Sequence, residues 1–229
     1  MKHWSYLAAA CALLPFAAAG QNDSTSVALR YSVSFKDAVV ATQSVSIVHS
    51  GGSTTIASSF AADLPVFVAI HHFAEQLSVT FRPADGTVER LGARLQDGPN
   101  VTVVSGALAS NDALRIVRTD MDGITTNLVA RTDYDFHSLA FYGRAPADFL
   151  TTNVPARVLS IAQGEVRPVG IQTIAESDTF ERQYLVSTHL VWTDGAYVSH
   201  SWHPERFSNL PRRYVRRTDA GEFVFHLIR

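Results

Sequence analysis

Three histidines capable of binding a metal lie in residues 184–203, YLVSTHLVWTDGAYVSHSWH. Asp194-Gly195 between two β-rich runs predicts a β-hairpin, because a type I′ turn needs positive φ at both central residues. Opposed residues of a hairpin share a face, and successive pairs alternate between faces. A two-residue turn here predicts four cross-strand pairs: Thr193–Ala196, Trp192–Tyr197, Val191–Val198 and His189–His200.

This pairing makes His189 and His200 the candidate metal ligands, since opposed side chains approach closely enough to share an ion. Glu205 is nearby in the sequence as a possible oxygen ligand. His203 is expected on the opposite face, so a third ligand must otherwise come from elsewhere, with His137 and Asp135 as candidates. The alternative is a pair of half-exposed strand histidines that makes the protein mildly pH-sensitive.

Other polar clusters have simpler interpretations. His71 and His72 are adjacent on an expected strand, so they face opposite ways and do not share one ion. Residues 133–137, DYDFH, place Asp133, Asp135 and His137 on one side of an extended chain, without an evident nucleophile. Residues 120–123, DMDG, start like a calcium loop, but Val129 stands where a glutamate is needed, which favours a hairpin turn.

No GxSxG elbow, HExxH or P-loop motif occurs in the sequence. We therefore expect a non-enzymatic protein without a cofactor, with a metal-assisted hydrolase using His189 and His200 as a minor alternative.

Arginines are dense near the end of the chain, at positions 206, 212, 213, 216 and 217. Guanidinium groups match carboxylate and phosphate geometry, so the cluster is a candidate contact for an anionic lipid or glycan. On a strand, Arg212 and Arg216 share one face and Arg213 and Arg217 the other. We expect Arg212, Arg216, Trp202 and Tyr142 to contact a ligand.

Composition is that of a globular protein with one core: 46% of the 229 residues are hydrophobic and 17% are charged. A net charge of −2 gives no case for nucleic-acid binding.

Residues 1–20 have the pattern of a signal peptide, with Lys2, an apolar stretch and Ala17-Ala18-Ala19 before the expected cleavage point. The single cysteine, Cys11, lies in this segment, so the mature chain is expected to have no disulfide. No other stretch is long and apolar enough for a membrane span.

Short β-type segments and regular turns follow from Val27 onward. Val27–Phe35 alternates apolar and polar residues, and turns are expected at residues 50–53, 83–86, 97–99, 122–123, 163–164 and 219–221. Residues 64–82 favour strand over helix, and Pro146–Leu150 could begin a short helix. The sequence predicts one all-β domain over residues 21–229, a strongly curved antiparallel sheet or open barrel of about a dozen strands, with at most short helical turns.

Four segments carry a resemblance to a known group of proteins. They are RYSVSFKDAVVATQSVSI (30–47), PADFL (146–150), VLSIAQGEV (158–166) and VSHSWHPERFSNLPRRYVRRTDAGEFVFHLIR (198–229). Their order resembles a family of exported bacterial β-rich proteins of unknown function. The resemblance implies export and a β-rich fold, and it implies no activity or site residues. A looser likeness, of fold only, is to the half-barrel carriers that move lipoproteins across the periplasm.

Export and the surplus of aromatic residues in residues 64–81 and 134–149 lead to one functional hypothesis. We expect a periplasmic or secreted protein that holds a lipid-like or amphipathic molecule on a concave sheet. The alternative partner is an envelope protein, bound through the arginine-rich C-terminal strands.

Overall fold

One antiparallel sheet dominates the computed structural model, which describes residues 24–66, 69–109, 112–142, 155–180, 183–194, 197–204, 210–218 and 221–228. Two short 3-10 helices, η1 (Arg131–Asp133) and η2 (Ala140–Tyr142), are the only helices in this part of the chain. The fifteen strands are β1 (Thr25–Phe35), β2 (Ala38–Ser50), β3 (Ser53–Val66), β4 (Ala69–Phe81), β5 (Val88–Asp97), β6 (Asn100–Leu108), β7 (Ala113–Asp120), β8 (Gly123–Ala130), β9 (Phe136–His137), β10 (Ala156–Ser160), β11 (Glu165–Phe180), β12 (Gln183–Asp194), β13 (Tyr197–Pro204), β14 (Arg213–Thr218) and β15 (Gly221–Ile228).

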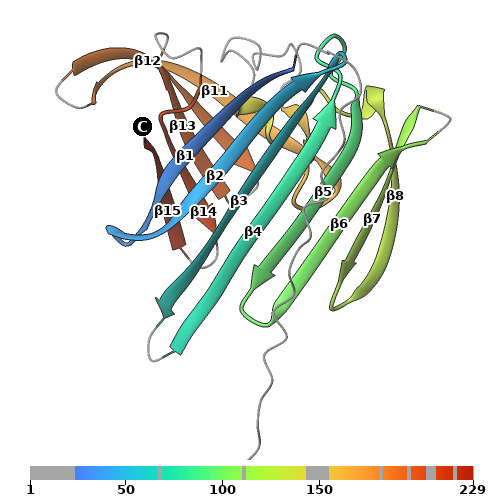
Figure 1. Cartoon of the computed structure of the whole chain (residues 1–229), viewed down its shortest axis with the longest axis horizontal. Helices are drawn as coiled ribbons and strands as arrows, with labels where there is room; N and C mark the ends of the chain where they lie inside the picture. The colour runs from blue at the N-terminus through green and yellow to red at the C-terminus, as the bar shows by residue number, and fades with distance from the viewer. Residues whose placement is uncertain are drawn as a thin grey trace, which may run out of the picture.

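The sheet consists of two meanders that join through the first and last strands. Its order is β8-β7-β6-β5-β4-β3-β2-β1-β15-β14-β13-β12-β11-β10-β9, and every neighbouring pair is antiparallel except β9 and β10. β1 pairs with β15 over six positions, from Arg30↔Ile228 to Phe35↔Phe223. Figure 1 shows β1, β2 and β15 side by side although they come from opposite ends of the chain.

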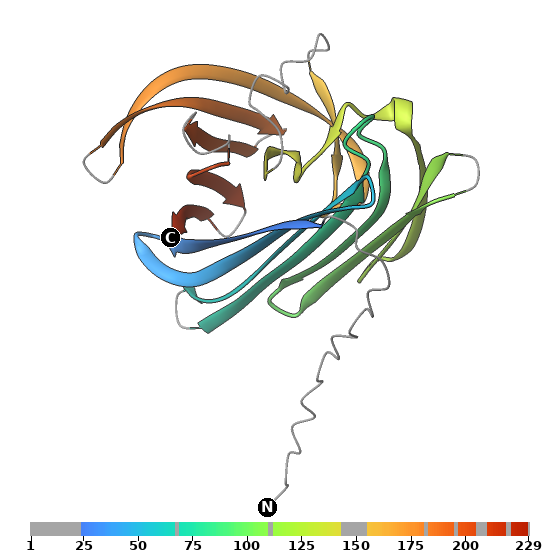
Figure 2. The ribbon, with the colours of Figure 1, turned by 45° about the horizontal axis from the view of Figure 1, so that its top comes forward.

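The predicted fold class is confirmed. The sheet is all-β and curves strongly, so that β11 and β12 lie across from β1 and β2 (Figure 2). Its edges are β8 and β9, which do not pair with each other. A sheet with this many strands must curl to bury one face, because right-handed twist accumulates from strand to strand.

Alternation along each strand sends one set of side chains to the concave face. In β1, Tyr31, Val33 and Phe35 are buried while the residues between them are only partly covered. Phe223 and Phe225 of β15 continue the same interior, and Phe60 of β3 packs on both rings at centroid distances of 6.0 and 5.5 Å. The concave face is therefore a packed aromatic core over much of its length.

The segment that follows β8, residues 131–142, contains η1, β9 and η2 and runs through the interior instead of around it. Six of its residues are buried: Tyr134, Phe136, His137, Leu139, Ala140 and Tyr142. The Tyr134 hydroxyl accepts a hydrogen bond from the backbone N–H of Val88 at 2.9 Å. Because this segment fills space that an empty half-barrel would leave open, it decides how much room remains for a ligand (Figure 2).

The turn between β10 and β11 contacts strands near the opposite edge of the sheet. Gly164 has φ of +69°, and a Cβ there would lie 2.8 Å from side-chain atoms of both Val104 and Ile116. The Gly164 carbonyl also accepts a hydrogen bond from Asn127 Nδ2 at 3.5 Å. Only glycine has both the backbone freedom and the small size for this contact.

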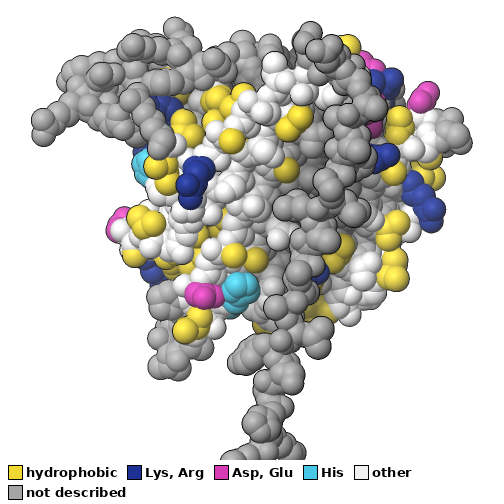
Figure 3. Space-filling view, in the orientation of Figure 1, with side chains coloured by type: hydrophobic (Ala, Val, Ile, Leu, Met, Phe, Trp, Pro, Cys, Tyr) yellow, Lys and Arg dark blue, Asp and Glu magenta, His cyan; other side chains and the backbone are white. Residues whose placement is uncertain are grey.

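The outer face carries mostly small and polar side chains. Figure 3 shows one side of the molecule, where hydrophobic side chains are scattered among others. Ile70, Ile124 and Val39 are among the exposed large hydrophobic residues. Scattered residues of this kind are ordinary on protein surfaces. None of the described residues form a helix long and apolar enough to cross a bilayer.

The hairpin of β12 and β13 forms, but the predicted register was wrong. The structure pairs Val191 with His200 and His189 with Trp202, and Asp194 with Tyr197 at the end of the ladder. All four predicted pairs, including Trp192–Tyr197, are displaced. The two registers differ by two residues, so each side chain points to the same face in one register as in the other. Apolar alternation therefore does not distinguish between them. Residues 195–196 lie outside the described part of the chain.

Other local predictions have clear outcomes. Within the stretch 64–82, residues 64–66 and 69–81 are strand, as expected, and they belong to β3 and β4. Asp120 pairs with Gly123 at the tip of a hairpin, and the Asp122 N–H donates to Asp120 Oδ1 at 3.0 Å, which confirms the turn. The expected helix start at Pro146–Leu150 and the expected signal peptide at 1–20 lie outside the described residues.

Candidate functional site

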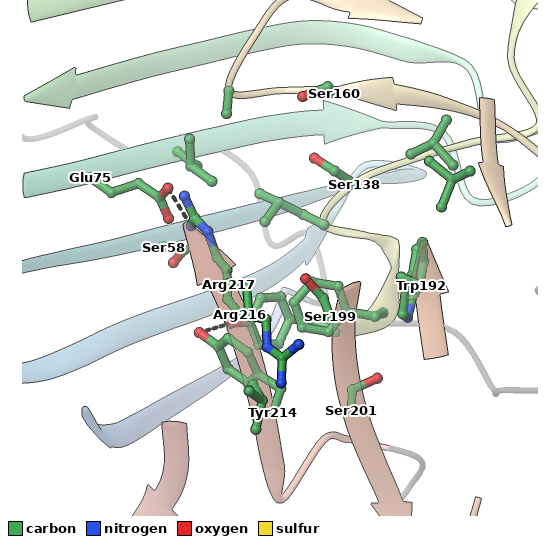
Figure 4. A pocket seen from close by; sticks show the side chains of 18 of the residues that line it. Ser58, Glu75, Ser138, Ser160, Trp192, Ser199, Ser201, Tyr214, Arg216 and Arg217 are labelled. Carbon is green, nitrogen blue, oxygen red and sulfur yellow. Dashed lines mark hydrogen bonds and ion pairs between the residues drawn. The ribbon is translucent and has the colours of Figure 1, made fainter. Parts of the chain in front are cut away.

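An interior cavity of about 400 Å³ lies between the crossing segment 131–142 and strands β10 to β14. Its volume is within the ordinary range of small-molecule sites. Strands β2 and β4 form the wall behind it, so residues far apart in the sequence meet there (Figure 4). The lining has an apolar part and a polar part, described in turn.

The apolar part lies around Trp192 of β12. This ring contacts Phe136 edge-on at a centroid distance of 5.7 Å and Phe141 at 6.4 Å. The aliphatic lining residues are Leu77, Leu139, Val158, Ala162, Val169 and Val215. These surfaces suit a hydrocarbon or aromatic group, because they lose contact with water when it binds.

The polar part begins with a buried hydrogen-bond network centred on Gln43 of β2, which is 2% exposed. Its Nε2 donates to Ser58 Oγ at 2.7 Å, and its Oε1 accepts from the hydroxyls of Tyr214 and Tyr142. The single hydroxyl proton of Tyr142 is shared between Gln43 Oε1 at 3.4 Å and the Tyr214 hydroxyl oxygen at 3.2 Å. Nearby, the Tyr31 hydroxyl donates to the Pro211 carbonyl at 2.8 Å. A buried amide with both ends bonded avoids the cost of an unsatisfied polar group.

Burial holds these phenols in the neutral form. Burial is the main reason why the pKa values of Tyr142 and Tyr214 lie far above the usual value, because a charged phenolate would be poorly solvated there. Tyr31 has its pKa raised for the same reason, with a smaller effect from Tyr142. The tyrosines therefore act as hydrogen-bond donors in the cavity wall and not as bases.

An ion pair between Glu75 of β4 and Arg216 of β14 borders the same wall. Arg216 Nη1 donates to Glu75 Oε2 at 2.5 Å, and the Glu75 side chain is 2% exposed. Burial lowers the pKa of the Arg216 guanidinium, but the charge and hydrogen bond of Glu75 raise that pKa by more. Figure 4 shows Arg216 extending toward Glu75 across the cavity wall. The Arg216 guanidinium therefore remains charged.

The cavity reaches a gap between β13 and β14. These two strands pair only over His200↔Val215, Ser201↔Tyr214 and Trp202↔Arg213. Beyond that ladder the lining includes Ser199 of β13 and both Arg216 and Arg217 of β14, which are neighbours on opposite faces of the strand. Arg217 is more than half exposed. The gap therefore offers a route between the cavity and solvent.

Two of the four predicted ligand contacts, Tyr142 and Arg216, line the cavity, and the other two do not. Trp202 is on the opposite face of β13 from Ser201, stacked 4.5 Å from the His189 ring, with the Arg213 guanidinium 4.5 Å from its own ring. Arg212 is buried, 6% exposed, and its backbone N–H donates to the Trp202 carbonyl at 2.9 Å. Strand alternation and the packing of the C-terminal strands explain this separation.

The arginine-rich ending does not form one exposed patch in the described residues. Arg212 is buried, Arg213 covers Trp202, Arg216 pairs with Glu75, and only Arg217 is exposed. Arg206 lies outside the described part of the chain. The interaction of this ending with an envelope protein stays a prediction.

The two candidate metal ligands do come together, although they are not directly opposed. His189 Nε2 lies 3.0 Å from His200 Nδ1, so one ring donates a hydrogen bond to the other. Burial and the neighbouring His189 lower the pKa of His200, which favours its neutral form. His203 is on the other face, with Nε2 2.9 Å from Ser201 Oγ. Within the described ranges, no three His, Cys, Asp or Glu side chains form a group that could hold a metal ion.

The proposed third ligands His137 and Asp135 have other contacts, and Glu205 lies outside the described residues. His137 packs against Phe81 at a ring distance of 4.5 Å, and Asp135 Oδ1 accepts from Arg157 Nη2 at 3.0 Å. Asp133 lies in η1, where its Oδ2 accepts from the Ala130 N–H at 2.7 Å. These residues therefore stabilise the crossing segment. His71 pairs with Asp97 and His72 with Asp63, in agreement with their expected opposite directions.

The sequence interpretation did not single out Gln43 or Glu75, although a signal for both is present. Gln43 has the strand parity of the buried Val45 and Ile47, and Glu75 that of Phe73 and Leu77. A polar residue at a position that alternation assigns to the interior predicts a buried, paired group. Ser201 and His203 were missed as a pair, since only the structure shows that both point inward and touch.

Comparisons with family models, with curated proteins and with solved structures found no match for this chain. The resemblance to exported β-rich proteins stays a prediction.

Proposed function

We propose that this protein is a non-enzymatic carrier or receptor that binds an amphipathic small molecule in its interior cavity. The observation that carries the proposal is the division of the lining. An aromatic and aliphatic part surrounds Trp192, and a hydrogen-bonding, charged part surrounds Gln43 and Arg216. A ligand with one apolar and one polar end would satisfy both parts at once.

Export to the periplasm or out of the cell belongs to the same proposal. It is supported by the signal-like composition of residues 1–20. A carrier of amphipathic molecules is useful where a hydrophobic molecule must cross an aqueous compartment. A fusion that reports cleavage and export tests this part separately.

Native mass spectrometry of protein purified from its natural host tests the binding function. We expect an adduct that disappears on extraction with organic solvent. Ala162→Phe, which fills part of the cavity, should abolish the adduct, whereas Ala107→Phe, at an exposed position outside the lining, should retain it. Protein that carries no adduct and also fails to bind a fluorescent amphiphile would reject the proposal.

A second candidate function, acyl transfer, is favoured by one contact. Ser201 Oγ lies 2.9 Å from His203 Nε2, and Ser201 borders the cavity. In this scheme the His203 imidazole takes the hydroxyl proton as the Ser201 oxygen attacks an ester carbonyl. The ester C–O bond then breaks, the imidazolium gives the proton to the departing alcohol, and water releases the acid from the acyl-serine in the same way. A fluorophosphonate probe should then label wild-type protein and not Ser201→Ala. If the wild-type protein is not labelled, the Ser201–His203 contact serves to give the buried imidazole a hydrogen-bond partner.

A further inference from the structure

Among the described residues that line the cavity, positively charged side chains outnumber negatively charged ones. Three are arginines, Arg167, Arg216 and Arg217, and one is an acid, Glu75. Charge in a partly enclosed site is screened less by water and salt than charge on the open surface. Arg167 Nε donates to Glu165 Oε1 at 2.8 Å, outside the lining, so the charge that a ligand meets depends on Arg216 and Arg217.

Glu75 does not offset this imbalance for a ligand, because its carboxylate is already paired. Its Oε2 accepts from Arg216 Nη1 at 2.5 Å, and its side chain is almost fully buried. A cationic ligand would have to displace this arginine and leave a buried charge without its partner, which is costly. The pair therefore disfavours cations and contributes a neutral wall.

Arg217 is in a different situation, at the gap between β13 and β14. Its Nε donates to Glu222 Oε2 at 3.0 Å, and both side chains are about half exposed, at 57% and 45%. Exposed pairs of this kind contribute little to stability, so a ligand can share or replace Glu222 at small cost. In the described part of the chain, the two Nη groups of Arg217 donate to no other residue. They remain able to form the two parallel hydrogen bonds that a guanidinium makes with an oxyanion.

We propose that the ligand is an amphiphile with a single oxyanion head group, a carboxylate or a phosphate monoester. Arg217 binds the head group at the gap, and the apolar body lies against Trp192, Val158 and Val169. This inference rests on the proposed binding function and adds the charge of the ligand and its direction in the cavity. Ser199, which lines the same gap, supplies a hydroxyl that can also donate to the head group.

Matched probes with one chain length test the proposal on the full-length protein. Decanoate, decyl phosphate and decanol are titrated while tryptophan fluorescence is recorded. We expect at least one anion to bind about tenfold or more tightly than decanol, as a charge-assisted hydrogen bond predicts. Whichever of the two anions binds better distinguishes a carboxylate ligand from a phosphate. If decanol binds as well as both anions, the function stands and the anion inference falls; if none of the three binds, the binding function itself falls.

Two variants make the assignment specific. Arg217→Gln should weaken binding of the anions by about tenfold and leave decanol binding unchanged, because only the head group loses a partner. Arg115→Gln, on the exposed side of β7 and outside the lining, should change neither. Thermal unfolding of both variants verifies that they are folded. An anion affinity that is equal in Arg217→Gln and wild type would overturn the role of Arg217.

Discussion

Arg216 on β14 donates a hydrogen bond to Glu75 on β4 at 2.5 Å, although 141 residues separate them in the sequence. The bond joins the two meanders across the interior of the sheet. It therefore fixes the distance between the walls of the cavity.

Glu75→Gln should destabilise the protein, because it leaves the Arg216 charge without its carboxylate. Removing one partner of a fully buried pair costs roughly 3–5 kcal/mol. Arg216 is 31% exposed, so water offsets part of the loss, and we expect about 2–3 kcal/mol by urea unfolding. Glu222→Gln, in the exposed pair with Arg217, is the matched control and should cost less than about 1 kcal/mol.

Combining Glu75→Leu with Arg216→Met should recover most of this stability, since two apolar residues leave no buried charge behind. If the double variant is no more stable than Glu75→Gln, the pair contributes more than compensation of its own charges.

Tyr214→Phe should cost about 1–3 kcal/mol, because its hydroxyl is the close donor to Gln43 Oε1 inside the core. Tyr142→Phe should cost less, since its bonds to Gln43 and Tyr214 are longer, at 3.4 and 3.2 Å. Urea unfolding of both variants checks this order. The reverse order would mean that Tyr142 is the principal partner of Gln43.

High pH should unfold the protein through its buried tyrosines. Burial raises the pKa of Tyr31, Tyr142 and Tyr214 in the folded state, whereas in the unfolded chain they ionise near the usual value of about 10. Their contribution is complete below pH 10 and is lost as the pH rises further, because only the unfolded state then releases protons. Near-ultraviolet absorbance should show these phenols ionising together with loss of β-sheet circular dichroism. Ionisation of all seven tyrosines without unfolding would contradict this expectation.

Gly164→Ala should be more damaging than the same change at Gly51. Both glycines have positive φ, +69° and +58°, so both variants bear a left-handed strain of about 1–2 kcal/mol. At Gly164 the added Cβ also meets Val104 and Ile116 at 2.8 Å, and overpacking adds about 1–3 kcal/mol. Gly51 has nothing within 4 Å of an added Cβ. Equal thermal shifts in the two variants would show that the β10–β11 turn does not pack tightly against β6 and β7.

Acid should weaken the protein through His200. Burial, and then His189, depress the pKa of His200 below 6.5 in the folded state. Stability is therefore complete above pH 6.5, and it falls as the pH drops toward the lower folded-state pKa, because the unfolded state then binds more protons. Protonation of both rings would also break the bond between His189 Nε2 and His200 Nδ1. His200→Gln should lose less stability than wild type between pH 7 and acid; parallel curves would exclude His200 as the cause.

Apolar alternation and turn residues were sufficient for the class of fold and for many local elements. The alternation in residues 27–35 sets which side chains of β1 face inward, and the Asp120–Gly123 turn follows from glycine's access to positive φ. The same alternation failed at the β12–β13 register, since a shift by two leaves every face unchanged. Local patterns report which face a residue takes, and they carry little information about distant partners.

The amino-acid sequence by itself determined that this chain is an antiparallel β protein with His189 and His200 on one face. Only the tertiary structure decided that β1 pairs with β15, that residues 131–142 pass through the interior, and that Glu75 meets Arg216 beside a cavity. The reason is that these contacts join residues far apart in the chain. Their free energy depends on the simultaneous packing of the whole curved sheet, which no local window of sequence contains.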